Sequence, residues 1–82
     1  MAVDFEKLVL DLVTPLVIHP EDLLVKKFSE DETSITIQVL VNQEDLGRVI
    51  GRGGRIANAI RTLAYAAASR LGKRVSIDID SF

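Results

Sequence analysis

The chain has 82 residues with a formal net charge of −2, and it contains no cysteine. This length allows a single domain over residues 1–82, and the composition excludes disulfides and thiolate metal sites. No apolar run is long enough to span a bilayer, and Asp4 and Glu6 stand where a signal peptide would need basic residues. We therefore expect no membrane insertion, and the expected location is cytoplasmic.

The N-terminal half predicts one helix and two strands. Apolar residues recur at spacings of three and four over residues 3–18, which is typical of an amphipathic helix, and Pro15 is expected to kink its last turn. Residues 23–28 predict a strand, and residues 29–33 predict a polar hairpin loop. Residues 34–41 alternate cleanly and predict a second strand. Its buried side is expected to hold Ile35, Ile37, Val39 and Val41.

The C-terminal half predicts two helices joined by a glycine-rich turn, and then a last strand. Asn42 is a suitable N-cap for a short helix that ends at Gly51, because glycine is favoured in the left-handed conformation that closes helices. A longer helix is expected from Arg55 to Leu71, and residues 73–80 predict the last strand. The core face of the longer helix is expected to comprise Ile56, Ile60, Leu63, Ala67 and Leu71.

The order αββααβ predicts an α+β fold. The first two strands would form an antiparallel hairpin, and the third would pair in parallel with one of them through a right-handed crossover. The expected result is a three-stranded mixed sheet with three helices on one face.

Positive charge is concentrated around the glycine-rich turn. Residues 46–77 hold seven Lys or Arg and no acidic residue, whereas the rest of the chain holds three Lys and twelve Asp or Glu. Backbone N–H groups at a helix N-terminus attract phosphate oxygens, and glycine lets a sugar–phosphate backbone approach closely. The pattern favours a nucleic-acid site. The alternative is a tight turn that needs glycine only for its positive φ.

The run Leu46–Ile60 resembles the signature of K-homology (KH) domains, I-G-x-x-G followed by an Ile-containing helix. KH domains use this loop to clamp four nucleotides of a single strand, and the αββααβ order resembles their type II, prokaryotic arrangement. More narrowly, nearly the whole chain is similar to the KhpA family of small bacterial single-KH RNA-binding proteins. The further matching segments are residues 15–17, 59–63, 66–68 and 72–75.

The resemblance implies a non-catalytic protein that binds single-stranded RNA, with no cofactor and no metal. It implies a post-transcriptional regulator or RNA chaperone, in a family associated with cell elongation and division. The implied RNA-binding residues are a clamp of Gly51, Arg52, Gly53 and Gly54, flanking Arg48 and Arg55, and an apolar floor near Val49, Ile50 and Ile56. The edge of the second strand, around Gln38 and Leu40, would form the opposite wall. Many KH domains have a basic or larger residue at the Gly53 position, so charge at the tip rests on Arg52.

Alanine is unusually frequent in the longer helix, at positions 57, 59, 64, 66, 67 and 68. Because alanine is the best helix former, this excess can be explained without any function. The resemblance, however, implies homodimers and pairing with a larger KH-containing partner, KhpB. The interface residues assigned on this basis are Tyr65, Ala66, Ala68 and Arg61.

Other functions have weaker support. His19 is the sole histidine, and we expect it in a surface loop without a catalytic partner. A nucleotide-dependent enzyme is disfavoured because G-x-x-x-x-G-K-[ST], and G-x-G-x-x-G after a strand, are absent. The acidic residues at 30–32, 78 and 80 are expected on a loop and on the wet face of a strand, and not around a metal. A protein-interaction adaptor with little RNA binding of its own is the alternative function.

Overall fold

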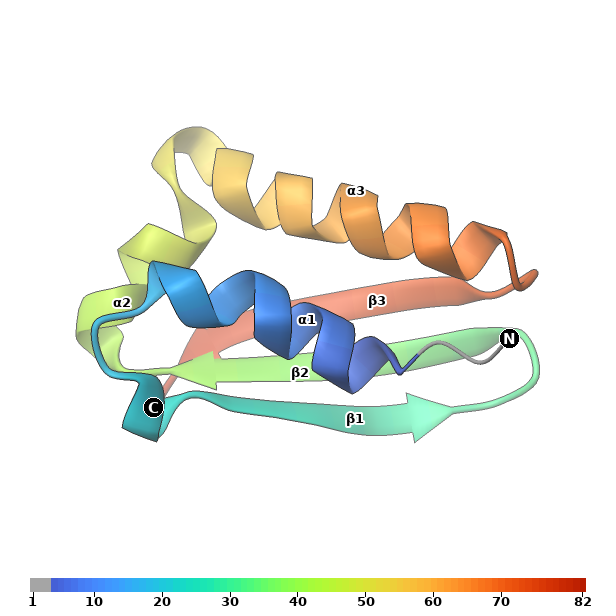
Figure 1. Cartoon of the computed structure of the whole chain (residues 1–82), viewed down its shortest axis with the longest axis horizontal. Coiled ribbons are helices and arrows are strands. Elements are labelled where there is room, and N and C mark those ends of the chain that lie inside the picture. Colours follow the sequence, from blue (N-terminus) through green and yellow to red (C-terminus); the bar gives the residue numbers. More distant parts are fainter. Residues whose placement is uncertain (1–3) are drawn as a thin grey trace.

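The computed structural model describes residues 4–82 and has the predicted order of helices and strands (Figure 1). Its elements are α1 (Phe5–Val13), 3₁₀ turns at Thr14–Leu16 and Pro20–Asp22, β1 (Leu24–Glu30), β2 (Ser34–Val41), α2 (Gln43–Ile50), a 3₁₀ turn at Arg52–Gly54, α3 (Arg55–Ser69) and β3 (Arg74–Ser81). The first helix is shorter than predicted, because Pro15 ends the α-helical hydrogen bonding and begins a 3₁₀ turn. Residue 3, where the prediction began this helix, lies outside the described residues.

The sheet is mixed, as predicted, with strand order β1-β2-β3. β1 runs antiparallel to β2, and β3 runs parallel to it after the crossover through α2 and α3. Figure 1 shows α1 and α3 running alongside one another next to the strands, with α2 at the end where β2 finishes. No helix in the described part of the chain is long and apolar enough to cross a membrane.

The core lies between one face of the sheet and the three helices. The four alternating residues of β2 are all buried, as predicted, and β3 adds Val75 and Ile77. From α1 the core receives Phe5, Val9 and Val13, which are spaced by four and lie on one side of the helix. The opposite face of the sheet is half-buried or exposed, so the three helices share one face.

β1 extends two residues beyond its predicted end. The register shifts between Lys27 and Ser29, so Phe28 bulges out of the ladder and is 76% exposed. Glu30 then closes the strand with ion pairs to Lys27 (2.8 Å) and to Lys73 (2.6 Å), which precedes β3. These hydrogen bonds, from Lys27 first and then from Lys73, lower the pKa of Glu30 to about 2. The start of the segment that was predicted as a loop is therefore strand, and its last strand residue, Glu30, is held by two ion pairs.

The core face of α3 differs from the prediction. Ile60 is buried as expected, but Leu63 and Leu71 are 53% and 41% exposed, and Ile56 is 36% exposed. The buried positions are instead Ala57, Ile60, Ala64 and Ala68. Small side chains let the backbone of α3 lie close to the sheet and to α1, where a leucine would not fit. Half of the six alanines of α3 are therefore buried in the core, and some of its larger apolar residues are exposed.

Candidate nucleic-acid interface

The connection between α2 and α3 is built by glycines with positive φ. The side chain of Asn42 caps α2 by accepting a hydrogen bond from the Glu44 N–H (2.9 Å), and the helix ends at Gly51, as predicted. Gly51 has φ 76° and ψ 171°, so its φ is positive, but its ψ lies far from the left-handed helical conformation that was expected. A Cβ on Gly51 would lie 2.9 Å from the backbone nitrogen of Ile56 and would overlap that side chain. Packing as well as φ therefore requires glycine here.

The tip of this connection is open. Gly53 and Gly54 adopt left-handed conformations with φ 65° and 81°. A Cβ on Gly53 would meet no atom within 4 Å, so the tip is free of neighbouring protein. Gly54 occupies the N-cap of α3 and has no side chain to accept the first-turn N–H groups. These N–H groups, at the positive end of the helix dipole, can donate hydrogen bonds to an anionic oxygen atom from outside the chain.

Three exposed arginines, Arg48, Arg52 and Arg55, surround the connection. Among residues 4–82, every ion pair within 4.0 Å has a lysine or His19 as its cation, and none has an arginine. Their guanidinium groups are therefore not neutralised by carboxylates of the described chain. Guanidinium donors match phosphate oxygens in a bidentate geometry, which makes this surface suited to a polyanion.

The apolar residues predicted as a floor are only partly accessible. Val49 is fully buried in the core and cannot contact a ligand, so its assignment is wrong. Ile50 is half-buried, and Ile56 is 36% exposed. Of the three residues predicted for the apolar floor, Ile50 and Ile56 are therefore the accessible ones.

The predicted opposite wall is also wrong. Gln38 and Leu40 belong to β2, which pairs with β1 on one side and β3 on the other, so β2 has no free edge. The free edge next to α3 belongs to β3. Arg61 connects the two elements, because its Nε and Nη2 donate to the carbonyl oxygen of Ile77 at 3.3 and 3.1 Å.

The residues predicted as a protein interface do not share one surface. Ala68 is 1% exposed in the core and is unavailable to a partner, so that assignment is wrong. Arg61 is half-buried and bonded to β3, and Tyr65 lines a groove between α3 and the start of β3. Ala66 is exposed on the outer side of α3. Arg61 and Tyr65 therefore share the side of α3 that lies next to β3, whereas Ala66 lies apart from them.

Asp45, at the other end of α2, is a structural residue that the sequence did not reveal. It is fully buried, and its two carboxylate oxygens accept hydrogen bonds from the backbone N–H groups of Ile18 and His19, each at 2.9 Å. Burial acts to raise its pKa, but these hydrogen bonds, together with the charges of His19 and Arg48, keep the pKa below its usual value. Asp45 thereby fixes the segment after α1 against the start of α2.

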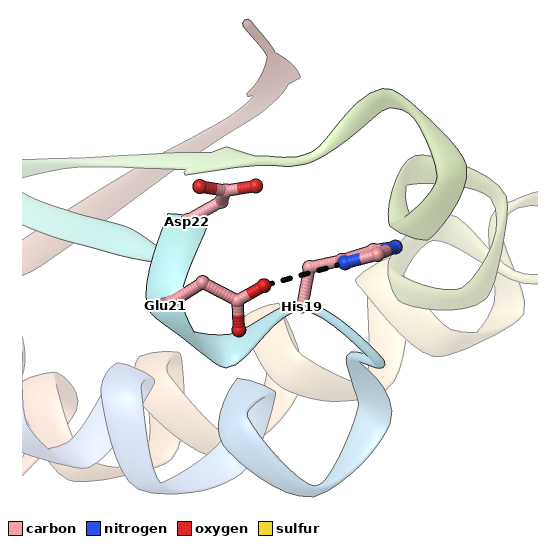
Figure 2. Close-up of side chains that lie close together, drawn as sticks. All are labelled: His19, Glu21 and Asp22. Atoms are coloured by element: carbon pink, nitrogen blue, oxygen red, sulfur yellow. Dashed lines mark ion pairs between the residues drawn. The ribbon is translucent and has the colours of Figure 1, made fainter.

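The imidazole of His19 lies between the carboxylates of Glu21 and Glu44. Figure 2 shows the ion pair with Glu21. Its Nδ1 is 3.4 Å from Glu21 and its Nε2 is 3.4 Å from Glu44 in α2. Burial acts to lower the pKa of His19, but the Glu21 hydrogen bond and the neighbouring charges raise it overall. Asp22 lies nearby and accepts a hydrogen bond from Asn42 (3.0 Å).

Within residues 4–82, one group of histidine and carboxylate side chains is compact enough to hold a metal ion. It consists of His19, Glu21 and Asp22, whose possible ligand atoms lie within 4.8 Å of one another. Each of these side chains already has a partner in the chain. The group therefore serves to connect the Pro20–Asp22 turn to the start of α2.

The chain matches the model of the KhpA/KhpB KH-domain family over residues 6–79. It is 50% identical over 74 residues to RNA-binding protein KhpA of Listeria monocytogenes, covering 90% of this chain and 96% of that protein. It is 42% identical over 74 residues to RNA-binding protein KhpA of Bacillus subtilis, covering 90% of each.

Among solved structures, the chain is similar to Era in complex with MgGDPNP and nucleotides 1506–1542 of 16S ribosomal RNA. The TM-score is 0.65 at 20% identity, covering 94% of this chain and 29% of the Era chain. The chain thus corresponds to less than a third of Era, and this similarity concerns the fold alone.

Proposed function

This chain belongs to the KhpA/KhpB KH-domain family and has the type II KH fold, and on that premise we propose that it binds single-stranded RNA without catalysing a reaction. The observation that carries the proposal is the open glycine tip between α2 and α3, surrounded by exposed arginines that pair with no carboxylate of residues 4–82. The names of the relatives, which are RNA-binding proteins, support it.

The proposed mechanism is a phosphate clamp. The backbone of an RNA strand passes over Gly53, where no protein atom obstructs it, and its phosphates accept from the first-turn N–H groups of α3. Arg52 neutralises charge at the tip, and Arg48 and Arg55 do so at the flanks. The bases rest near Ile50 and Ile56. Three phosphate contacts on a single strand give a slope of about −2 when log affinity is plotted against log salt concentration.

The test is a double substitution in the clamp, Arg52→Asp with Gly53→Asp. It places repulsive charge and side-chain bulk where the phosphate would lie, and we expect affinity for single-stranded RNA to fall at least about tenfold by fluorescence anisotropy. The matched control is Lys26→Asp with Ser29→Asp, which makes the same change in net charge at exposed positions of β1. Equal affinity of the folded clamp variant and the control would exclude the connection as the RNA site.

Self-association through the outer side of α3 is the second part of the proposal. Ala59, Leu63 and Ala66 are exposed at helical spacing, and Leu63 is 53% exposed. Small residues around a leucine let a second helix approach closely, so a second copy of this chain, or a KhpB-like partner, fits this surface. The alternative function, a protein-interaction adaptor, would use the same surface. Leu63→Asp is expected to halve the mass of a dimer in light scattering, and an unchanged dimer mass would refute this assignment.

A regulatory or chaperone role in the cytoplasm follows only if the protein contacts RNA in the cell. In-cell crosslinking and sequencing of bound RNA tests this, with the clamp variant as the control. Recovery of the same RNAs from both proteins would count against the clamp. Partner binding without RNA recovery from the unmodified protein would favour the adaptor function.

A further inference from the structure

The face of the sheet turned away from the helices carries an apolar patch near the end where β2 finishes. Leu40 of β2 is half-buried on this face, because its neighbours Val39 and Val41 are buried on the helix side. Leu24 of β1 pairs with Leu40 in the register and is 37% exposed. Phe82, which follows β3, is 61% exposed. Within residues 4–82 neither leucine belongs to the hydrophobic core, so this patch is separate from it.

Three aspartates border the patch, and none of them forms an ion pair within residues 4–82. Asp78 and Asp80 are exposed on β3, and the register places Asp80 beside Leu40. Asp22 lies just before β1, where its carboxylate accepts a hydrogen bond from the side chain of Asn42 (3.0 Å). A shallow depression next to it is lined by Asp22, Asn42, Gln43 and Phe82. The aspartates therefore stand on the β1 side and on the β3 side of the leucine pair.

The charge of this patch is opposite to that of the glycine connection. Lys26 projects from the same face in the next row, opposite Gln38, and offsets one of the three aspartates. The remaining negative charge repels an RNA strand and an anionic lipid surface. Exposed apolar patches with a polar border are typical of surfaces that bind another protein. The expected ligand is therefore a protein segment that carries positive charge.

A basic amphipathic helix matches the arrangement of these side chains. Neighbouring strands lie about 5 Å apart, so β1 and β3 are separated by about 10 Å, which is close to the diameter of a helix. A helix lying over β2 places its apolar stripe on Leu24 and Leu40. Lysines or arginines on both flanks of that stripe then reach the aspartates on the two sides. An added strand does not use this patch, because the patch lies on the face of the sheet and not at an edge.

We propose that the open face of the sheet binds a basic amphipathic helix of another protein. The apolar contacts are made by Leu24, Leu40 and Phe82, and the ion pairs by Asp22, Asp78 and Asp80. The clamp lies in the helical layer, so RNA bound there leaves this face uncovered, and both ligands can be held together. The inference goes beyond the proposed function and does not depend on RNA binding.

The test measures, by fluorescence anisotropy, the binding of a labelled synthetic peptide that forms a helix with a leucine stripe flanked by lysines. Asp78→Asn with Asp80→Asn is expected to weaken binding about fivefold. The matched control is Glu6→Gln with Glu32→Gln, which removes two exposed carboxylates that also lack an ion pair within residues 4–82. This control is expected to bind like the unmodified protein.

The apolar part of the patch is tested in the same way. Leu24→Asn is expected to weaken peptide binding about fivefold. The matched control is Leu10→Asn on α1, because Leu10 is 39% exposed and lies away from the open face of the sheet. A peptide of the same composition in scrambled order forms no leucine stripe, and it is expected to bind at least about fivefold more weakly.

Several results would overturn the proposal. Equal binding of the helical and the scrambled peptide is one, and equal affinity of the Asp78 and Asp80 variant and its control is another. A change of protein mass in light scattering for either face variant would assign the face to a second copy of this chain instead. The clamp variant is expected to bind the peptide no more weakly than the unmodified protein does. A loss of peptide binding in that variant would place the peptide at the glycine connection and overturn the proposal.

Discussion

The two ends of α2 carry opposite charges. The rest of the described chain forms hydrogen bonds and an ion pair with the charged side chains of the N-terminal end only. At the N-terminal end, Asp45 and Glu44 bind the segment that contains His19 through hydrogen bonds and an ion pair. At the C-terminal end, Arg48 and Arg52 pair with no carboxylate of residues 4–82, beside a glycine tip with open space around it. Charge that is satisfied inside the molecule stabilises the fold, whereas charge left unsatisfied is available to a ligand. We therefore expect substitutions at the two ends of this eight-residue helix to affect stability and RNA affinity separately.

The largest effect is expected within the glycine connection itself. Gly51→Ala forces a Cβ into Ile56 and an alanine into positive φ, so we expect a loss of about 3 kcal/mol in unfolding free energy. Gly53→Ala has the same φ problem but no neighbour within 4 Å, and we expect a loss of about 1 kcal/mol. Urea denaturation measures both.

The two glycine variants also differ in their expected binding. Gly51→Ala displaces the start of α3, so RNA affinity falls together with stability. Gly53→Ala places a methyl group where the phosphate backbone would pass, so we expect it to reduce RNA affinity more than stability. Equal losses of stability at the two positions would contradict the assignment of Gly51 to packing and Gly53 to an open tip.

The next largest effect is expected at the acidic end. Asp45→Asn keeps the size of the side chain but turns an N–H donor toward Ile18 or His19, so one of two buried hydrogen bonds is lost. The midpoint of thermal unfolding is expected to fall by about 10 °C, with RNA affinity unchanged at low temperature. Loss of affinity without loss of stability would contradict the separation between the two ends.

Asp45 also gives a pH dependence of known sign. Its pKa is lowered in the folded state, so its contribution is present above the unfolded value of 3.8 and is lost as the pH falls through the folded pKa. In Asp45→Asn this part of the acid destabilisation is absent. Thermal unfolding of both proteins from pH 5 to pH 2 measures the difference.

The sheet and the glycine connection could be predicted from the sequence because their signals are local. Alternation along residues 34–41 is sufficient to identify a half-buried strand, and Asn42 and Gly51 mark the two ends of α2 by their own chemistry. The strand order is not local. The prediction that Gln38 forms one wall of the binding site was therefore wrong, because both edges of its strand, β2, are paired.

The core face of α3 and the role of Asp45 could not be predicted for the same physical reason. Choosing the largest apolar side chains selects Leu63, but burial depends on how close α3 lies to the sheet, and this favours Ala64. Acidic residues are common in the first turn of a helix, so the sequence does not distinguish Asp45 from an exposed residue. Only the tertiary position of the Ile18 and His19 N–H groups makes Asp45 a buried acceptor.

The smallest effect is expected from His19, at the same acidic end. Its pKa is raised above the unfolded value of 6.5, so its stabilisation is full below that pH and is lost as the pH rises through the folded pKa. His19→Asn is expected to lower the unfolding midpoint by roughly 2 °C at pH 5.5 and to have little effect at pH 8.5.

Partner substitutions separate the contributions to this pH effect. Glu21→Gln and Glu44→Gln each remove one of the carboxylates that face the imidazole, so each is expected to reduce the pH dependence in part. The same pH dependence in His19→Asn and in the unmodified protein would show that His19 does not connect the turn to α2. Since the proposed clamp lies at the opposite end of α2, we expect RNA affinity to be the same in the His19 variant at pH 8.5, where both proteins are equally stable.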